Sequence, residues 1–362
     1  MATIDQKPAV LKESKNKIRV DFERTSLKTR LKSKFLTLNF ATNAVWYIFR
    51  LLLLIGIAFV IIQPFITMIV QSIMAPQDFR DLTVVNVPRH FSLEIYKAIF
   101  QDAQYIKVFF STLALSLGTA VLQTFTCCLV GYGLAKFKFR GSKIIFFCVI
   151  LTMVIPHGTL QSAIYYQFRY FDILGVLKFF SGGASVGVAW IDNILSHIRI
   201  LPFPQGLNLV ETVVPLILMS MCGLALKNGL YVFMLRQFFR GVPDELEESA
   251  YLDGANTFRT FLQVILPISV PMMITVFLFA FCWQWTDDFY TNLFYTVARM
   301  KLMPSIVSIP SSLMLGYAGQ NLLDAAIKNT AGILIILPLV ILYVFCQRYL
   351  VQGIERSGLT AD

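Results

Sequence analysis

The sequence predicts an all-α, polytopic membrane protein with six transmembrane helices, and three observations lead to this fold class. Hydrophobic residues make up 56% of the chain and charged residues only 14%, with a mean hydropathy of +0.67. Soluble domains average about 45–50% apolar and about 25% charged residues. Stretches of roughly 20 mainly apolar residues, the length that a transmembrane helix needs, recur along the chain. Basic residues gather in alternate connecting segments, as expected of cytoplasmic loops.

The predicted spans are Leu51–Ile73, Val108–Leu134, Ile144–Tyr166, Val213–Phe239, Ile268–Trp285 and Ala331–Leu350. The third and the fourth are the least cleanly apolar. The first begins far into the chain and exceeds roughly 20 residues, so it is predicted to be an uncleaved anchor and not a secretory signal peptide.

The net charge of +10 is explained by membrane topology and not by a nucleic-acid partner. Ten Lys or Arg residues lie in the tail that precedes the first span, within residues 1–43. The segment AKFKFRGSK places four more in the next inside loop: Lys136, Lys138, Arg140 and Lys143. Because basic residues mark the cytoplasmic side, both termini are predicted to be cytoplasmic, with the chain in the cell (inner) membrane.

Four regions follow from this division. They are a basic cytoplasmic tail (1–43), the first span with its external loop (44–107), a core of five spans (108–350) and a cytoplasmic C-terminal tail (351–362). The tail is expected to include a surface helix over 27–40, and the external loop a short helix over 91–100. The core is expected to carry an external insertion at about 178–208 and a cytoplasmic loop at 241–267.

All six cysteines fall inside predicted spans, where a small apolar filler is the expected role, so we predict no metal site and no disulfide. They are Cys127, Cys128, Cys148, Cys222, Cys282 and Cys346.

An acidic, amphipathic passage lies between the fourth and fifth spans. In GVPDELEESAYLDG, Pro243 is predicted to begin a helix, and acidic residues that complement the positive end of its dipole follow: Asp244, Glu245, Glu247 and Glu248. Gly254 is placed to end this helix in a left-handed conformation. The next residues, ANTFRTFLQVILP, predict a second short helix that Pro267 closes.

The charge of the first of these helices indicates its partner. Its apolar positions Val242, Leu246 and Ala250 recur at helical spacing. A helix that rests on lipid headgroups usually carries Lys and Arg on its polar face. An acidic helix would be repelled by an anionic leaflet, so we expect this passage to meet a basic groove of a partner protein.

The same passage resembles the EAA loop of bacterial ABC-importer permeases. The matching positions are Glu248, Ser249, Ala250, Gly254, Val264, Leu266 and Pro267, with Ser at the second position of the motif and Val in place of Ile. Other stretches are similar to the maltose-type carbohydrate-uptake permeases, and among them to the smaller permease subunit: VGYGLAKFKFRGSK, YVFMLRQFFRGVPDELEESA, FCWQWTDDFYTNLFY and QRYLVQGIERSGL. The resemblance covers roughly residues 45–362.

This resemblance implies a type I ABC-importer permease fold and a set of partners. The partners are a second, similar permease, two ATP-hydrolysing subunits and an extracytoplasmic solute-binding protein. The loop helices would dock on the ATPase, with Glu248 near a basic residue there. Glu355 and Arg356, in QGIERSG, would also approach the ATPase, or else lie in a solvated tail.

The chain itself is predicted not to be an enzyme and to bind no cofactor. It contains no G-x-x-x-x-G-K-[ST] phosphate loop, so ATP would be bound by the partner subunit. The sequence has only three histidines and no H-x-x-x-H pattern, which disfavours a membrane hydrolase or transferase. A secondary transporter would normally work without an acidic coupling loop. A permease for a solute other than sugar is the remaining alternative.

Two sets of residues are candidates for the substrate pathway. Lys227 and Asn228 interrupt the fourth span, where an ionisable residue is costly and therefore marks a function. If that span starts later, Lys227 instead extends to the external interface.

The second set is the aromatic cluster of Trp283, Trp285, Phe289 and Tyr290 beside Asp287 and Asp288. Aromatic rings stack on sugars and carboxylates accept from their hydroxyls, but a membrane-interface aromatic belt predicts the same residues. The resembling family usually has Asn where Thr286 stands. In the maltose system the larger permease mainly holds the sugar. The insertion at about 178–208 is expected either to contact the solute-binding protein or to cap the helices.

Overall fold

The structure is a computed structural model, and it describes residues 12–14, 17–19, 38–81, 83–84, 87–172, 176–180, 192–193, 197, 206–225, 227–295, 301–314 and 320–358. By its internal contacts the chain divides into two units, Met1–Thr67 and Met68–Asp362.

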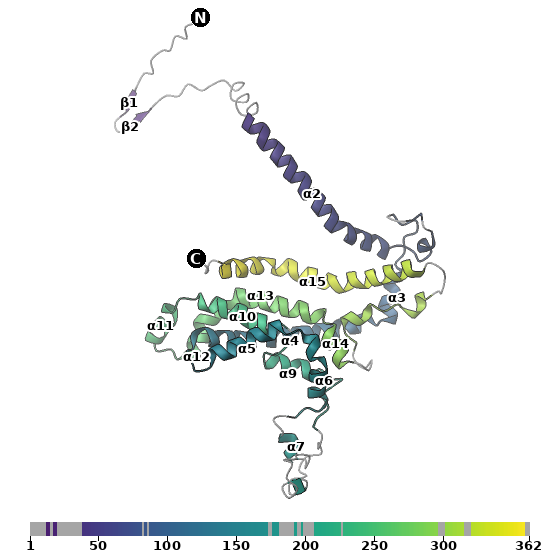
Figure 1. The fold of residues 1–362 in the computed structure, drawn as a ribbon. Helices are drawn as coiled ribbons and strands as arrows, with labels where there is room; N and C mark the ends of the chain where they lie inside the picture. The colour runs from purple at the N-terminus through teal and green to yellow at the C-terminus, as the bar shows by residue number, and fades with distance from the viewer. Residues whose placement is uncertain are drawn as a thin grey trace. The chain divides into compact units, whose positions relative to one another are not determined.

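The first unit contains a small hairpin and most of the first long helix. Strands β1 (Lys12–Ser14) and β2 (Lys17–Arg19) pair antiparallel, with Lys12 opposite Arg19. Helix α2 (Leu38–Ser72) contains the first predicted span and begins well before it (Figure 1). No side chain in its most apolar stretch is buried within the chain. The last residues of the predicted surface helix over 27–40 belong to α2, and residues 27–37 lie outside the described residues.

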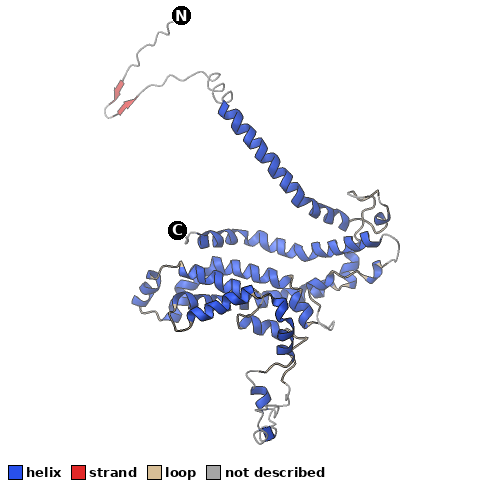
Figure 2. Cartoon of the chain, in the orientation of Figure 1, coloured by secondary structure: helices blue, strands red, loops and turns tan. Residues whose placement is uncertain are grey.

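The regular elements described in the second unit are all helices, joined by loops and turns (Figure 2). Its elements are η1 (Asp78–Arg80), α3 (Glu94–Asp102), α4 (Tyr105–Lys136), α5 (Ser142–Val154), η2 (His157–Leu160), α6 (Gln161–Arg169), α7 (Val176–Phe180), α9 (Val214–Met221), α10 (Asn228–Arg240), α11 (Glu245–Leu252), α12 (Thr257–Thr260), the π-helical turn η3 (Phe261–Ile265), α13 (Leu266–Trp285), α14 (Phe289–Phe294), η4 (Met303–Ile306), η5 (Ser311–Leu313) and α15 (Gln320–Gly358). The short helix predicted from its sequence over 91–100 is confirmed as α3.

Four helical segments of the described chain are long and apolar enough to cross a membrane: Thr42–Ser72, Tyr105–Lys136, Thr257–Trp285 and Gln320–Val351. They correspond to the first, second, fifth and sixth predicted spans. A bent pair, Ser142–Val154 with His157–Arg169, gives a fifth if it is counted as one span.

The third and fourth predicted spans are not continuous helices, so that part of the prediction is wrong. The third bends by 99° between α5 and the helical segment that begins at His157. Ile155 there is extended, as expected of a residue that precedes Pro156. The fourth divides into α9 and α10 because Gly223 and Lys227 both adopt left-handed backbone conformations, with φ of +70° and +68°. Hydropathy averaged over a window does not resolve breaks of this size.

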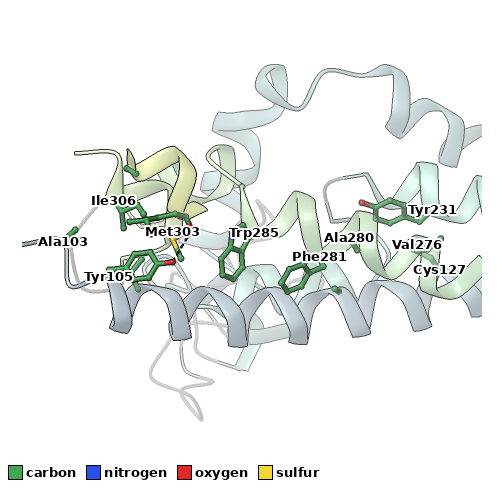
Figure 3. Packing of buried hydrophobic residues seen from close by; sticks show 14 of the residues in the cluster. Ala103, Tyr105, Cys127, Tyr231, Val276, Ala280, Phe281, Trp285, Met303 and Ile306 are labelled. Atoms are coloured by element: carbon green, nitrogen blue, oxygen red, sulfur yellow. Dashed lines mark hydrogen bonds between the residues drawn. The ribbon is translucent and has the colours of Figure 1, made fainter. Parts of the chain in front are cut away.

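Helix α4 lies at the centre of the core and packs against α9, α10 and α13. Figure 3 shows Phe281 and Trp285 projecting from α13 toward α4. At Gly131 the backbone of α10 approaches α4 closely, since a Cβ placed there would lie 2.9 Å from the Cβ of Leu235. Small residues of this kind allow membrane helices to pack without a hydrophobic driving force.

We expect Gly131→Ala to lower the thermal stability of the purified protein. The added methyl group would lie 2.9 Å from the Cβ of Leu235 and 3.1 Å from the amide nitrogen of Arg236. Overpacking of this kind costs about 1–3 kcal/mol. Gly133→Ala is the matched control, because nothing lies within 4 Å of its added Cβ. A melting temperature in detergent that is unchanged by Gly131→Ala, or lowered equally by both variants, would contradict the expectation.

Two side chains join this core to α15 at a proline. Pro338 has no N–H, so the carbonyl of Leu334, four residues earlier, lacks its helical donor. The Tyr105 hydroxyl donates to that carbonyl at 3.2 Å, and Trp285 Nε1 donates to the neighbouring carbonyl of Ile335 at 2.9 Å. The proline in the sixth span is thereby compensated by donors from α4 and α13.

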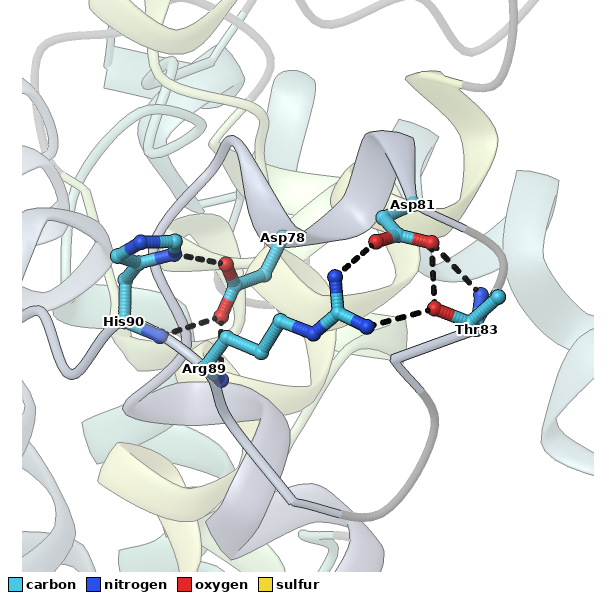
Figure 4. A network of polar contacts seen from close by, with 5 residues as sticks. All are labelled: Asp78, Asp81, Thr83, Arg89 and His90. Carbon is cyan, nitrogen blue, oxygen red and sulfur yellow. Dashed lines mark hydrogen bonds and ion pairs between the residues drawn. The ribbon is translucent and has the colours of Figure 1, made fainter.

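The segment after α2 is held by a polar network (Figure 4). The buried Asp78 carboxylate accepts the backbone N–H groups of Arg89 and His90 at 3.0 and 2.9 Å and lies 2.7 Å from His90 Nδ1. Burial acts to raise the pKa of Asp78, but these hydrogen bonds outweigh it and leave the pKa lowered. Arg89 also pairs with Asp81 at 2.5 Å. These contacts therefore hold Asp78 and Asp81 against Arg89 and His90.

Candidate functional site

Helix α11 carries the acidic half of the loop. It begins at Glu245, two residues after the predicted start at Pro243, and the backbone carbonyl of Asp244 accepts the N–H groups of Glu247 and Glu248, both at 3.0 Å. Three glutamates occupy its first turn: Glu245, Glu247 and Glu248. Negative charge at this end of a helix is stabilised by the helix dipole. The sequence therefore forms a short helix whose acidic residues gather at its start.

Gly254 ends α11 as predicted. Its φ is +81°, a conformation that glycine adopts without steric cost. The N–H of Gly254 donates to Tyr251 and that of Ala255 to Ala250, both at 3.0 Å, which is the Schellman arrangement. The chain then reverses, and the Asn256 side chain caps the next helix by accepting the Arg259 N–H at 2.8 Å. The turn between the two loop helices is thus fixed by local chemistry.

The prediction that Pro267 closes the second loop helix before the fifth span is wrong. Helix α12, the π-helical turn η3 and α13 follow one another directly, as one helical segment from Thr257 to Trp285. The N–H of Leu266 donates to the carbonyl of Phe261, five residues back. In this wider turn Pro267 lies among the first residues of α13, where its missing N–H is tolerated. Val264, Leu266 and Pro267 therefore lie within a transmembrane segment that begins in the loop.

A buried lysine ties the start of the loop to α4. Lys136 Nζ donates to the carbonyl of Val242 at 2.7 Å and to Asp244 at 2.5 Å, and it lies 3.6 Å from Glu247. The Lys136 side chain is only 7% exposed. Its hydrogen bond and charge hold the pKa of Asp244 below its usual value. The sequence indicates Lys136 only as part of the charge of the inside loop, because its partners Val242 and Asp244 lie more than 100 positions away.

The acidic residues of α11 divide between two directions. Glu247 is buried beside Lys136, whereas Glu248 and Ser249 are exposed and Ala250 is buried. Of the three apolar positions predicted to share one face, Val242 and Ala250 are buried and Leu246 is exposed. Leu246 instead joins a set of exposed residues, which we call the loop surface: Leu246, Glu248, Leu252, Phe258 and Leu262. Leu252 is 89% exposed, so the loop surface consists of four large apolar side chains and one carboxylate.

A cavity of about 300 Å³ lies where the third and fourth predicted spans break. Its lining comes from the bend after α5 and from the connection between α9 and α10: Thr152, Met153, Ile155, Pro156, His157, Gly223, Leu224, Ala225, Lys227, Gly229 and Leu230. Lys227 Nζ lies 4.7 Å from the centre of the Trp283 ring. A second, more open hollow of about 330 Å³ is lined by Gln161, Ser162, Tyr165, Tyr166, Asn292 and Leu293. Both hollows are lined by residues of the bent third span.

The other predicted pathway residues are placed differently from Lys227. Asn228 is 1% exposed, and its side-chain amide has no hydrogen-bond partner among the described residues. Trp285 is fully buried and bonded to α15, so the structure gives it a packing role. Asp287 is buried and accepts the N–H groups of Tyr290 and Thr291 at 3.3 and 3.0 Å at the start of α14. Burial raises the pKa of Asp287, and these donors act against that rise.

The alternative interpretation of the aromatic cluster as an interface belt also fails for two of its members. Trp285 and Tyr290 are both buried inside the chain, at 0% and 2% exposure. Trp283 is 47% exposed and contacts Lys227. Trp285 and Tyr290 therefore belong to the core, whereas Trp283 is partly exposed at the surface of the chain.

Two predicted sites fall largely outside what the structure describes. Helix α15 runs past the predicted end of the sixth span to Gly358, but the side chains of Glu355 and Arg356 lie outside the described residues. Most of the insertion at about 178–208 lies outside them as well. Its base is described: Phe171 and Leu207 form an antiparallel bridge through two hydrogen bonds of 2.9 Å. The segment between them therefore leaves and rejoins the helical core at one point.

Bent spans around a cavity, and an acidic loop joined directly to a span, are features of a multi-pass transport permease. Residues 128–356 match the family described as binding-protein-dependent transport system inner membrane component, and the chain belongs to this family. It is thus a multi-pass protein of the inner membrane that works with partner subunits.

Similar proteins include three named permeases. The arabinooligosaccharides transport system permease protein AraQ of Bacillus subtilis is 27% identical over 75% of this chain and 80% of its own length. The polygalacturonan/rhamnogalacturonan transport system permease protein YtcP of the same organism is 25% identical over 83% and 93%. The maltodextrin transport system permease protein MalD of Streptococcus pneumoniae is 25% identical over 88% and 95%.

A solved structure shows the same fold. A chain of a crystal structure of a bacterial ABC transporter involved in the import of the acidic polysaccharide alginate aligns with a TM-score of 0.60 and 16% identity, over 85% of this chain and 97% of that one. At this level of identity the likeness establishes the architecture alone.

Proposed function

We propose that the chain is the transmembrane permease subunit of an ATP-driven, binding-protein-dependent importer of a carbohydrate, most simply an oligosaccharide. The observation that carries this proposal is the loop surface, which exposes Glu248 on a helix fixed to two different spans. The named relatives support carbohydrate as the cargo, because the arabinooligosaccharide and maltodextrin permeases are similar over most of this chain.

The second hollow has the chemistry of a carbohydrate surface. Tyr165 and Tyr166 offer rings that can stack on the apolar face of a sugar, while Gln161 and Asn292 offer amides that both donate to and accept from hydroxyls. An inorganic anion has no apolar face on which such rings could stack. The hollow therefore favours the carbohydrate proposal over a permease for inorganic anions.

The proposed assembly contains a second homologous permease, two ATP-binding subunits and an extracytoplasmic solute-binding protein, with both termini of this chain in the cytoplasm. ATP is bound by the partner subunits, since this sequence has no phosphate loop. The matched motif residues Glu248, Ser249, Ala250 and Gly254 lie in the segment that docks on an ATPase subunit. Glu355 and Arg356 are proposed to approach the same subunit, and the external insertion the binding protein.

The coupling mechanism follows from how the loop is attached. Helix α11 connects through Gly254 to α12, which continues without interruption into α13. The other end of the loop is bonded to α4 through Lys136. Closure of the two ATPase subunits would move α11, and this displacement would pass to both spans and change which side of the membrane the pathway faces. Lys227 remains the residue proposed to line that pathway, whereas the buried Asn228 does not reach the cavity.

Uptake by the complete reconstituted complex tests the proposal. We expect a labelled oligosaccharide to accumulate in proteoliposomes only when the binding protein is outside and ATP is available to the ATPase subunits. Accumulation that persists without the ATPase subunits would support a secondary transporter instead. Accumulation of peptides or amino acids, with no oligosaccharide imported, would contradict the cargo class.

A further inference from the structure

The cavity at the broken spans has an unusual charge composition. Among its described lining residues, Lys227 is the one that carries an ammonium group. Thr152 and His157 are the other described lining residues with polar side chains, and none of the described lining residues has a carboxylate or a carboxamide. Groups that bind neutral sugars combine acceptors with donors, because each hydroxyl both donates and accepts. This cavity instead offers an excess of positive charge.

The ammonium group of Lys227 is held in place without being neutralised. It lies over the Trp283 ring at 4.7 Å, and no ion pair to it occurs among the described residues. A cation–π contact stabilises and orients a cation but leaves its formal charge available. An unpaired charge within a predicted span is a candidate functional site, because burying it in the membrane would be costly.

The backbone at Lys227 supports the same conclusion. Its φ of +68° is rare for a residue with a side chain, and such conformations concentrate at functional sites. Lys227 is also the residue that precedes the first turn of α10, whose dipole adds positive potential on the same side. Gly229 in that turn packs against α5, where a Cβ would lie 2.4 Å from the Thr152 hydroxyl. The lysine is therefore presented at the cavity by a rigid, closely packed element.

We propose that this cavity binds the carboxylate of an acidic sugar unit, so that the cargo of the importer is a uronate-containing oligosaccharide. This inference rests on the proposed function and narrows its substrate class. The cavity has a volume of about 300 Å³, at the lower end of small-molecule pockets. This volume suits one or two sugar units at a time. The Lys227 ammonium pairs with the carboxylate, while the tyrosine-lined hollow is available to neutral parts of the chain.

The test compares two ligands that differ only at the carboxyl groups, which are charged in one and methyl-esterified in the other. The complete complex, without its binding protein, is placed in nanodiscs of phosphatidylcholine, and binding of labelled trigalacturonate and of its methyl ester is measured. We expect the acid to bind about tenfold more tightly than the ester, the discrimination of one charge-assisted hydrogen bond. Lys227→Gln is expected to bring the ratio close to one, and Lys227→Arg to retain it.

Four results would overturn the inference. Equal affinity for acid and ester in the unaltered complex would show that the cavity does not recognise charge. A ratio unchanged by Lys227→Gln would place the recognition elsewhere. Loss of the discrimination when phosphatidylglycerol is added to the nanodiscs would identify the cation as a lipid-headgroup site. ATP-driven uptake of neutral oligosaccharides alone would overturn this inference and leave the proposed function intact.

Discussion

Glu248→Arg is expected to abolish ATP-driven uptake while the protein still inserts into the membrane in normal amounts. Glu248 is exposed on the loop surface beside apolar side chains such as Leu252 and Phe258. In the proposed complex it meets a basic residue of an ATPase subunit, so reversal replaces an attraction with a repulsion. A like-charge contact within an interface costs several kcal/mol, and we therefore expect uptake to fall by about a hundredfold or more.

The experiment measures labelled sugar uptake, ATP hydrolysis and recovery of the ATPase subunits with the tagged permease. Glu245→Arg is the matched control, because Glu245 is also exposed in the first turn of α11 but lies outside the matched motif. We expect Glu245→Arg to retain most of the uptake. Normal uptake by Glu248→Arg would refute the docking role, and equal losses in both variants would show that the effect is one of overall loop charge.

Local signals were sufficient to predict this helix from the sequence. Pro243, the glutamates that follow it and Gly254 each act on the residues next to them, through the fixed φ of proline, the helix dipole and the freedom of glycine at φ of +81°. Effects that act only between neighbouring residues can be predicted from a single sequence. The start and end of α11 accordingly lie within two residues of the predicted positions.

Features that depend on distant parts of the chain could not be predicted in the same way. Lys136 and Asp244 are separated by 108 positions, and nothing near either one indicates the other. Pro267 was interpreted by its usual effect as a helix terminator, whereas the π-helical turn before it removes the conflict. The breaks in the third and fourth spans, on either side of the cavity, could be predicted only in part. Lys227 indicated an interruption of the fourth span, but not that α5 also ends at the same cavity.

Lys136→Met is expected to uncouple ATP hydrolysis from transport. Methionine is unbranched and similar in length to lysine, but it has no ammonium group. The substitution therefore removes the hydrogen bonds to Val242 and Asp244. It also leaves the largely buried Glu247 without its nearby cation. A carboxylate buried without a partner is unfavourable, so α11 should shift away from the end of α4.

Once α11 is no longer bonded to α4, displacement by the ATPase reaches α13 alone. We expect the number of sugar molecules imported per ATP hydrolysed to fall by about tenfold, within the range that coupling free energies of about 1–3 kcal/mol produce. Lys138→Met is the matched control, since Lys138 is exposed in the same connection and donates no hydrogen bond in the described part of the chain. Adding Glu247→Gln to Lys136→Met removes the unpaired charge. This double variant should recover thermal stability but not coupling, and recovery of both would reduce Lys136 to a purely structural role.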